Sequence, residues 1–170
     1  MHNKYDTRAF VLKARPYKED SVEVLLFTEE LGKVRAVAQA AKKPGATFAA
    51  ATEPGTFGYY TLLKGRYQWR VVGMNDLTQY SFTLQGETKE TYLKILGLFS
   101  RLLPEEEVHI EVFNKLENFL EENPEDLQRG EAEVVFSLLS ELGYADKTAN
   151  VEKKDALIRA VNKGIIAADL

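Results

Sequence analysis

The stretch that decides the fold is residues 15–69, which read RPYKEDSVEVLLFTEELGKVRAVAQAAKKPGATFAAATEPGTFGYYTLLKGRYQW. Apolar and polar residues alternate through much of it, with the period of two that is typical of half-buried strands. Turn signals separate these segments at Gly32, Pro44-Gly45, Pro54-Gly55 and Gly65. We predict a long connection over residues 40–55 and strands over residues 9–14, 21–28, 33–39, 56–63 and 67–72.

Five short strands with a long insertion after the third favour an OB-fold barrel, and a small SH3-like barrel is the alternative. After about residue 81 the apolar period changes to 3.6, which indicates helices. One helix is expected to end at Pro104, with Glu105–Glu107 in the first turn of the next, and another is expected to start at Asn123-Pro124. The predicted fold class is α+β, with an OB-fold domain over residues 1–80 and an α-helical domain over residues 81–170.

The net charge of −4 over 170 residues hides an asymmetry between the two halves. Residues 1–80 hold 12 Lys and Arg against 8 Asp and Glu, whereas residues 81–170 hold 10 against 18. The first half is therefore the one suited to a polyanion. No apolar run reaches the length of a membrane helix, and no signal peptide is recognisable, so we expect a cytoplasmic protein without membrane contact.

Signatures of enzymes and of metal sites are missing from the sequence. The chain has no cysteine, no glycine-rich phosphate-binding loop and no nucleophile elbow, and its two histidines, His2 and His109, lie far apart. A metal site needs a cluster of ligands, which these residues do not offer. We therefore expect a binding protein that is not an enzyme and that uses no cofactor or metal.

Basic residues interleaved with aromatic ones are the strongest functional signal in the barrel half. Lys33 and Arg35 fall on one face of a strand, about 7 Å apart, and Val34 and Ala36 fall on the other. Cations can contact phosphates and exposed rings can stack on bases, although about half of the rings must fill the barrel. The predicted nucleic-acid contacts are Lys33, Arg35, Lys42, Lys43, Phe48, Tyr60, Lys64, Arg66, Tyr67 and Arg70.

The order of short motifs resembles the RecO family of recombination mediators. In the barrel half the motifs are RPY, ED, LFT, GKV, KKP and EP, and in the helical half they are RLLPEEE at residues 101–107 and FSLLSELGY at residues 136–144. Many family members carry a four-cysteine zinc module after the Leu-Gly-Tyr helix. Here residues 145–151 stand in its place, so the resemblance is to a short form without that module.

The resemblance implies a protein of DNA repair and homologous recombination, associated with the nucleoid. Family members bind single- and double-stranded DNA, anneal complementary strands, and with RecR help to load RecA onto DNA covered by single-stranded DNA-binding protein. The tail of that protein docks on the helical domain. By position, the family's DNA contacts correspond to Lys33, Arg35, Lys42, Lys43, Lys64 and Arg66. Residues 45–47 carry no charge, so weaker DNA binding than usual is expected.

Two other functions remain open at this point. The chain could be an adaptor that docks partners of the repair machinery with weak or no DNA binding, as the modest charge of the barrel half allows. It could also be a different barrel protein that binds RNA. Measuring the binding of DNA, RNA and protein partners separates these functions.

Overall fold

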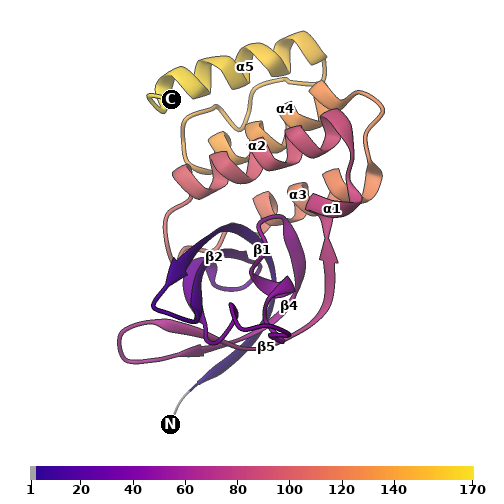
Figure 1. Ribbon diagram of the computed structural model, residues 1–170. Coiled ribbons are helices and arrows are strands. Elements are labelled where there is room, and N and C mark those ends of the chain that lie inside the picture. Colours follow the sequence, from indigo (N-terminus) through magenta and orange to yellow (C-terminus); the bar gives the residue numbers. More distant parts are fainter. Residues whose placement is uncertain (1–2) are drawn as a thin grey trace. The chain divides into compact units, whose positions relative to one another are not determined.

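The computed structural model describes residues 3–170, so His2 lies outside the described part. The chain divides into two compact units, of which the first ends at Val108 and the second spans His109–Leu170 (Figure 1). The elements of the first unit are β1 (Lys4–Tyr17), β2 (Ser21–Thr28), β3 (Gly32–Ala38), a short 3₁₀ segment (Ala50–Thr52), β4 (Thr56–Lys64), β5 (Trp69–Gln79), α1 (Tyr80–Thr83) and α2 (Gly86–Leu102).

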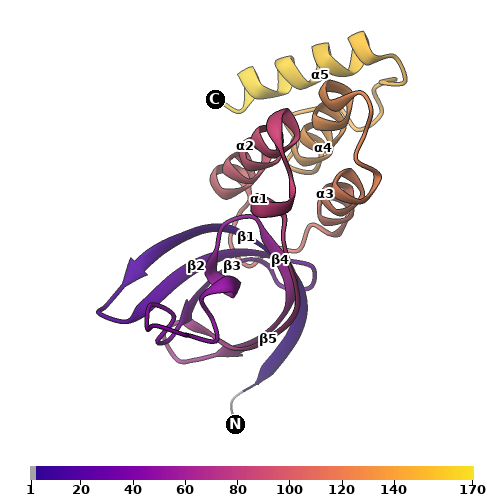
Figure 2. The same ribbon diagram turned by 45° about the vertical axis from the view of Figure 1, so that its right-hand side comes forward.

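The five strands close into a barrel in the order β1-β2-β3-β5-β4. Neighbouring strands are antiparallel except β3 and β5, which run parallel from the pair Ala36–Trp69 to the pair Ala38–Val71. Figure 2 shows the strands curling around a ring. A five-stranded barrel of this kind is an OB-fold, so the predicted fold class is confirmed.

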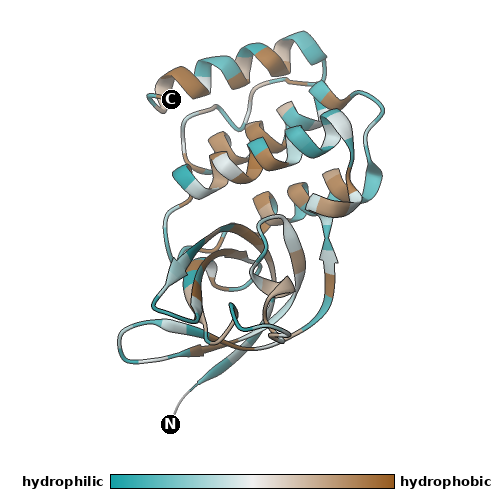
Figure 3. Cartoon of the chain, in the orientation of Figure 1, coloured by the Kyte–Doolittle hydropathy of each residue, from teal (hydrophilic) through white to brown (hydrophobic). Residues whose placement is uncertain are grey.

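The barrel core is formed by the inward-facing apolar residues of the strands, which include small and large side chains. Val34, Ala36 and Ala38 of β3 point inward as predicted, and all three are almost completely buried. Figure 3 shows hydrophobic stretches, in brown, along the strands of the barrel. The buried core consists of Ala9, Val11, Val24, Leu26, Val34, Ala36, Ala38, Ala41, Ala51, Tyr60, Leu62, Trp69 and Val71.

Helix α2 belongs to the barrel unit, although the sequence predicted a domain boundary after residue 80. The change from strand to helix does occur at Tyr80. The Tyr92 hydroxyl donates to the Gly55 carbonyl at 3.1 Å, and the rings of Phe99 and Phe27 meet edge to face at 5.5 Å. Because these aromatic side chains need the barrel wall to cover them, the compact unit extends to Val108.

The second unit consists of α3 (Ile110–Glu122), α4 (Leu127–Glu141) and α5 (Lys154–Ala167), with α4 packed against both other helices. The prediction that a helix starts at Asn123-Pro124 is wrong. The Asp126 side chain caps α4 by accepting from the Arg129 amide at 3.1 Å, and Asn123 ends α3 with a left-handed φ of 44°. Within residues 3–170, no helix is long and apolar enough to cross a membrane.

Candidate nucleic-acid interface

Three turns of the barrel meet at one end of it. The Lys42 amide donates to the Asp20 carbonyl at 3.1 Å, and the Lys42 ammonium donates to the Lys18 carbonyl at 3.3 Å. The Tyr17 hydroxyl reaches the side-chain oxygen of Gln68 at 3.2 Å. These bonds tie the β1–β2 turn to the loop after β3 and to the β4–β5 turn, and both ribbon views show the β1–β2 and β4–β5 turns on the same side of the barrel (Figures 1 and 2).

Exposed rings and cations gather on these joined turns. The Tyr67 side chain is 87% exposed, and the Arg66 guanidinium lies 5.2 Å from its ring centre. The Lys18 ammonium lies 5.4 Å from the ring centre of Tyr17. Lys43 is exposed and pairs only loosely with Asp20, at 3.7 Å. We call this region the turn surface, formed by Tyr17, Lys18, Lys42, Lys43, Arg66 and Tyr67.

A short segment at residues 104–108, which we call the strap, runs along the start of β3. Its backbone is held there, because the Glu106 amide donates to the Lys33 carbonyl at 2.8 Å and Glu105 forms a parallel bridge with Lys33. The prediction that Glu105–Glu107 form the first turn of the next helix is therefore wrong. A bridge and a hydrogen bond to the β3 backbone hold these residues in a connection that turns at Glu106, where φ is 55°, and the helix begins only at Ile110.

The strap carboxylates neutralise cations on this side of the barrel. Glu105 accepts from Arg35 at 2.8 Å. Glu106 accepts from the Trp69 indole at 2.8 Å and from the Lys64 ammonium at 2.9 Å, and these two bonds lower the pKa of Glu106. We call this region the strapped face, formed by Lys33, Arg35, Lys64 and Trp69.

Lys33 does not form the exposed row of cations with Arg35 that the sequence predicted. Its residue is only 7% exposed, and its ammonium donates to the Ser100 carbonyl at 3.1 Å, at the end of α2. Burial lowers the pKa of Lys33. The outer face of β3 is covered because the end of α2 and the strap pack there, which strand periodicity cannot indicate.

Tyr60 is a second correction, because it was expected at the surface and is 1% exposed. Its hydroxyl donates to the Ala51 carbonyl at 2.9 Å, and burial raises its pKa. The alternation of β4 is regular here, and Tyr60 lies on the inward face of the strand together with Leu62. Tyr67 is exposed as predicted, whereas Phe48 is partly buried against the barrel core and Arg70 is half-buried in β5.

Sequence reasoning missed Tyr17 and Lys18, which complete the turn surface. A signal for them existed, because they follow Pro16 in a turn between two alternating segments, where side chains are exposed. It also missed the role of Glu106 as the partner of Trp69 and Lys64. That role depends on a contact between residues far apart in sequence, for which no local pattern exists.

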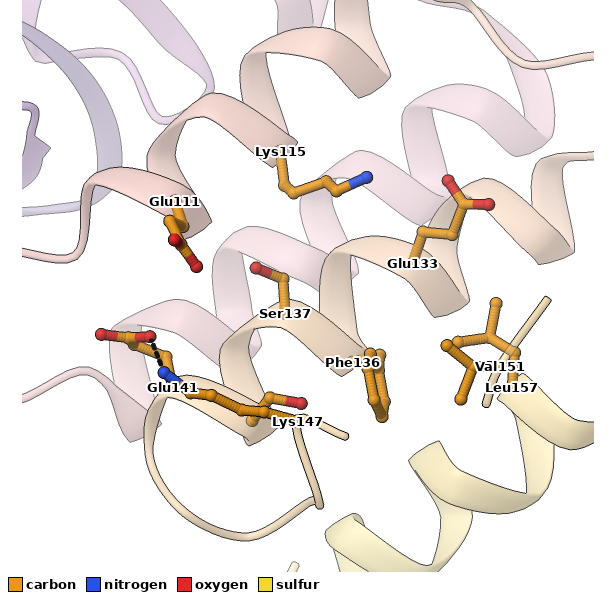
Figure 4. Close-up of a pocket in the computed structure, with 10 residues that line it drawn as sticks. Glu111, Lys115, Glu133, Phe136, Ser137, Glu141, Lys147, Val151 and Leu157 are labelled. Carbon is orange, nitrogen blue, oxygen red and sulfur yellow. Dashed lines mark hydrogen bonds and ion pairs between the residues drawn. The ribbon is translucent and has the colours of Figure 1, made fainter. Parts of the chain in front are cut away.

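The helical unit carries a pocket of about 380 Å³ of its own. Phe136, Val151 and Leu157 form an apolar wall, and Lys115 lies across from them (Figure 4). The Lys147 ammonium pairs with Glu141 at 2.7 Å. Among the described residues, no group of three or more His, Asp or Glu side chains is placed to hold a metal ion.

One family model and several known proteins are similar to this chain. Residues 1–84 match the family model described as recombination protein O N terminal. The chain is 35% identical over 88 residues to a DNA repair protein RecO of Clostridium novyi (strain NT), an alignment that covers 52% of this chain and 34% of that protein.

Two further relatives have a similar identity to this chain. A DNA repair protein RecO of Clostridium perfringens is 33% identical over 111 residues, with 65% of this chain and 44% of that protein covered. One from Escherichia coli (strain K12 / DH10B) is 35% identical over 111 residues, with 62% and 43% covered. The matched part of this chain thus spans less than half the length of these curated relatives.

Proposed function

The chain belongs to the RecO family, and on that premise we propose that it acts in DNA repair and recombination by binding single- and double-stranded DNA. Its contact region is the turn surface. Of the residues predicted from the sequence, Lys42, Lys43, Arg66 and Tyr67 belong to this surface.

The observation that carries the proposal is the pairing of two rings, the exposed Tyr67 and the half-buried Tyr17, with cations on turns that are bonded together. In OB-folds, the β1–β2 and β4–β5 loops are the ones that contact oligonucleotides. Tyr67 and Tyr17 offer surfaces on which bases can stack, and Arg66 and Lys18 beside them offer charge to the phosphates. The Tyr17–Gln68 bond holds the two loops together, so both can contact one strand.

The mechanism that we propose for strand annealing requires no catalytic residue and no cofactor. Two nucleic-acid strands repel each other through their phosphates, and cations on the protein reduce this repulsion where the strands meet. Base pairing then supplies the free energy of the reaction. The protein lowers the barrier to the first contacts between strands, and it does not take part in bond making.

Fluorescence anisotropy with a labelled oligonucleotide tests the proposal. We expect binding at about 50 mM salt that weakens steeply towards about 200 mM, because bound phosphates release counterions. Single-stranded DNA, duplex DNA and an RNA of the same sequence are compared in parallel. Absence of DNA binding at low salt would refute the proposal, and a clear preference for RNA would favour the RNA-binding alternative.

The strap supports a second candidate function, that of a repair adaptor with weak DNA binding. Glu105 and Glu106 already neutralise Arg35 and Lys64, which removes two cations from the surface open to DNA. A pull-down of repair partners with and without nuclease treatment separates the two functions. Capture that survives nuclease, together with weak anisotropy signals, would favour the adaptor.

The partners that we propose are RecR, the tail of single-stranded DNA-binding protein and, indirectly, RecA, in the cytoplasm. The pocket of the helical unit, with its apolar wall and Lys115, is the place we propose for the tail. The variant F136A should weaken binding of a tail peptide while far-UV circular dichroism stays unchanged. An unchanged peptide affinity would remove the pocket from consideration.

A further inference from the structure

A cationic pocket lies beside the turn surface, on the outer face of β1, β2 and β3. It has a volume of about 260 Å³, and the side chains that matter for it are Lys13, Arg15, Glu23, Leu25, Arg35 and Ser100. The strand register places Lys13 opposite Leu25, and Leu25 opposite Arg35. The buried Leu25 therefore forms the floor, with a cation on either side of it.

A β-bulge in β1 creates this arrangement. The register shifts between Val11 and Lys13, so Leu12 is an extra residue on that strand. Regular alternation would send Lys13 inward, as it does Ala9 and Val11, which are fully buried in the core. After the bulge, Ala14 packs against the core instead, and Lys13 and Arg15 are exposed. Bulges of this kind re-aim side chains, often beside functional sites.

The pocket holds more positive than negative charge. Lys13, Arg15 and Arg35 line it, with Glu23 as the one carboxylate among the lining residues. Burial is the main cause of the lowered pKa of Lys33; the charge of Glu105 raises this pKa, and the charges of Arg35 and Lys13 lower it. Glu105 and Glu23 thus offset part of the repulsion among these cations, and a further anion beside Lys13 and Arg15 would offset more of it.

Donor capacity is left over after the internal bonds are counted. Glu23 accepts from Arg15 Nε at 2.7 Å and from Arg35 Nη1 at 3.0 Å, both on the same oxygen. Glu105 accepts from Arg35 Nη2 at 2.8 Å, so both terminal nitrogens of Arg35 are bonded. The terminal nitrogens of Arg15 remain available, and its side chain is 65% exposed. In the described part of the chain, Lys13 makes no hydrogen bond or ion pair through its ammonium. Guanidinium groups with free terminal nitrogens suit the tetrahedral oxygens of a phosphate.

We propose that this pocket is a phosphate-binding site, in which the Lys13 ammonium and the terminal nitrogens of Arg15 hold one phosphate group. Arg15 is two residues before Tyr17, so the site continues the turn surface along β1. That the phosphate belongs to a nucleic-acid strand rests on the proposed function. A strand would then run from the stacked rings of the turns to the end of α2. Free phosphate is the other source of the same group.

Two measurements on the full chain test the site. In the first, inorganic phosphate is titrated at constant ionic strength while backbone amide signals are followed by NMR. Saturable shifts at Lys13 and Arg15 are expected in the wild type and should be lost in K13Q/R15Q. In the second, oligonucleotide affinity is measured against salt. Removing one phosphate contact should make the slope of log K against log salt shallower by about 0.7.

The matched control is K4Q/K89Q, which makes the same change in charge outside the pocket. Lys4 begins β1, about 30 Å along the strand from Lys13. K13Q/R15Q should weaken oligonucleotide binding about tenfold, and K4Q/K89Q should leave the slope unchanged. Arg15 also bonds to Glu23, so K13Q alone is measured as well; it removes no internal contact and should reproduce part of the loss.

The outcomes separate the site from the proposed function. Phosphate shifts together with a changed slope support the site and assign it to a strand. Phosphate shifts with an unchanged slope support the site and assign it to free phosphate. If no shifts appear and K13Q/R15Q matches the control, the site is refuted even when the wild type binds DNA. If the wild type binds no oligonucleotide, the proposed function fails and the phosphate titration still decides the site.

Discussion

Two ring–cation pairs lie within a few residues of each other and have opposite surroundings. The Lys64 ammonium lies 4.9 Å from the ring centre of Trp69, and the Arg66 guanidinium lies 5.2 Å from that of Tyr67. Trp69 is 6% exposed and Tyr67 is 87% exposed. The same pairing of charge and ring therefore serves the packing of the barrel in one case and is open to a ligand in the other.

The difference between the strapped face and the turn surface comes from the strap, residues 104–108. Glu106 bonds to both Lys64 and Trp69, so their polar groups are satisfied within the protein. In the described part of the chain, Lys18 and Arg66 have no carboxylate partner. A cation whose donors are already held closely by carboxylates gains little from a phosphate, because one ion pair only replaces another. Basic residues alone are thus a weak guide to a nucleic-acid surface.

The largest expected effect concerns two glycines, one under the strap and one in the turn-surface loop. Gly32 and Gly45 share a φ of +70°, but a Cβ on Gly32 would lie 1.9 Å from the Glu107 carbonyl oxygen, whereas one on Gly45 meets nothing within 4 Å. G32A should lower the free energy of unfolding by about 3–5 kcal/mol. G45A, the matched control, should lower it by about 1 kcal/mol. Urea denaturation measures both, and equal losses would contradict tight docking of the strap.

The next largest effect concerns the exposed ring–cation pair, Tyr67 and Arg66. R66A/Y67A should weaken single-stranded oligonucleotide binding by about 30-fold, because a stacking surface and a phosphate contact are both lost. The thermal midpoint should barely change, since Tyr67 is almost fully exposed. Y59A removes another exposed ring, on β4 and outside the turns, and should leave the affinity unchanged. An equal loss in Y59A would mean that the turns have no special role.

Neutralising the two strap carboxylates should make the strapped face more similar to the turn surface. E105Q/E106Q removes the carboxylate that pairs with Lys64 and one of the two that pair with Arg35, so oligonucleotide affinity at low salt should rise about threefold. The control E87Q/E90Q makes the same charge change at the start of α2, which a helix of 17 residues separates from the strap by about 20 Å. A rise of the same size in the control would show that only the net charge of the chain matters.

The smallest effect is a dependence of stability on pH through Glu23, the carboxylate that pairs with Arg35 of the strapped face and with Arg15. Burial raises the pKa of Glu23, but the hydrogen bonds from Arg15 and Arg35 outweigh it, so the pKa lies below its ordinary value of 4.5. The stability from this carboxylate is therefore present above pH 4.5 and is lost as the pH falls through its lowered pKa. The difference in unfolding free energy between wild type and E23Q, of order 1 kcal/mol, should shrink below pH 4.5. A difference that grows in acid would contradict the ion pairs.

Much of the fold was predictable because it depends on local pattern. Strand β2 begins and ends where the alternation predicted, at Ser21 and Thr28, and α2 ends just before Pro104. A period of two with Gly turns, followed by a period of 3.6, is enough to separate strands from helices. Helix starts were less predictable: Asp126 caps α4, whereas Asn123 ends α3 with a left-handed backbone.

The candidate site was predictable only in part. Arg66 and Tyr67 stand beside Gly65 in a turn, where exposure follows from local geometry, and both lie on the turn surface. Tyr60 and Lys33 were placed at the surface and are buried, in one case inside the barrel and in the other under α2 and the strap. The cover over Lys33 leaves no trace in the spacing of residues along the strand.

The sequence by itself determined the strands, the helices and the basic character of the barrel half, because these depend on residues that are neighbours along the chain. Only the tertiary structure decided which basic residues are available. A carboxylate brought from residues 105–106 neutralises Arg35 and Lys64, and one extra residue in β1 turns Lys13 and Arg15 outward. Charge acts over a few ångströms in space, so its effect depends on which segments the fold brings together.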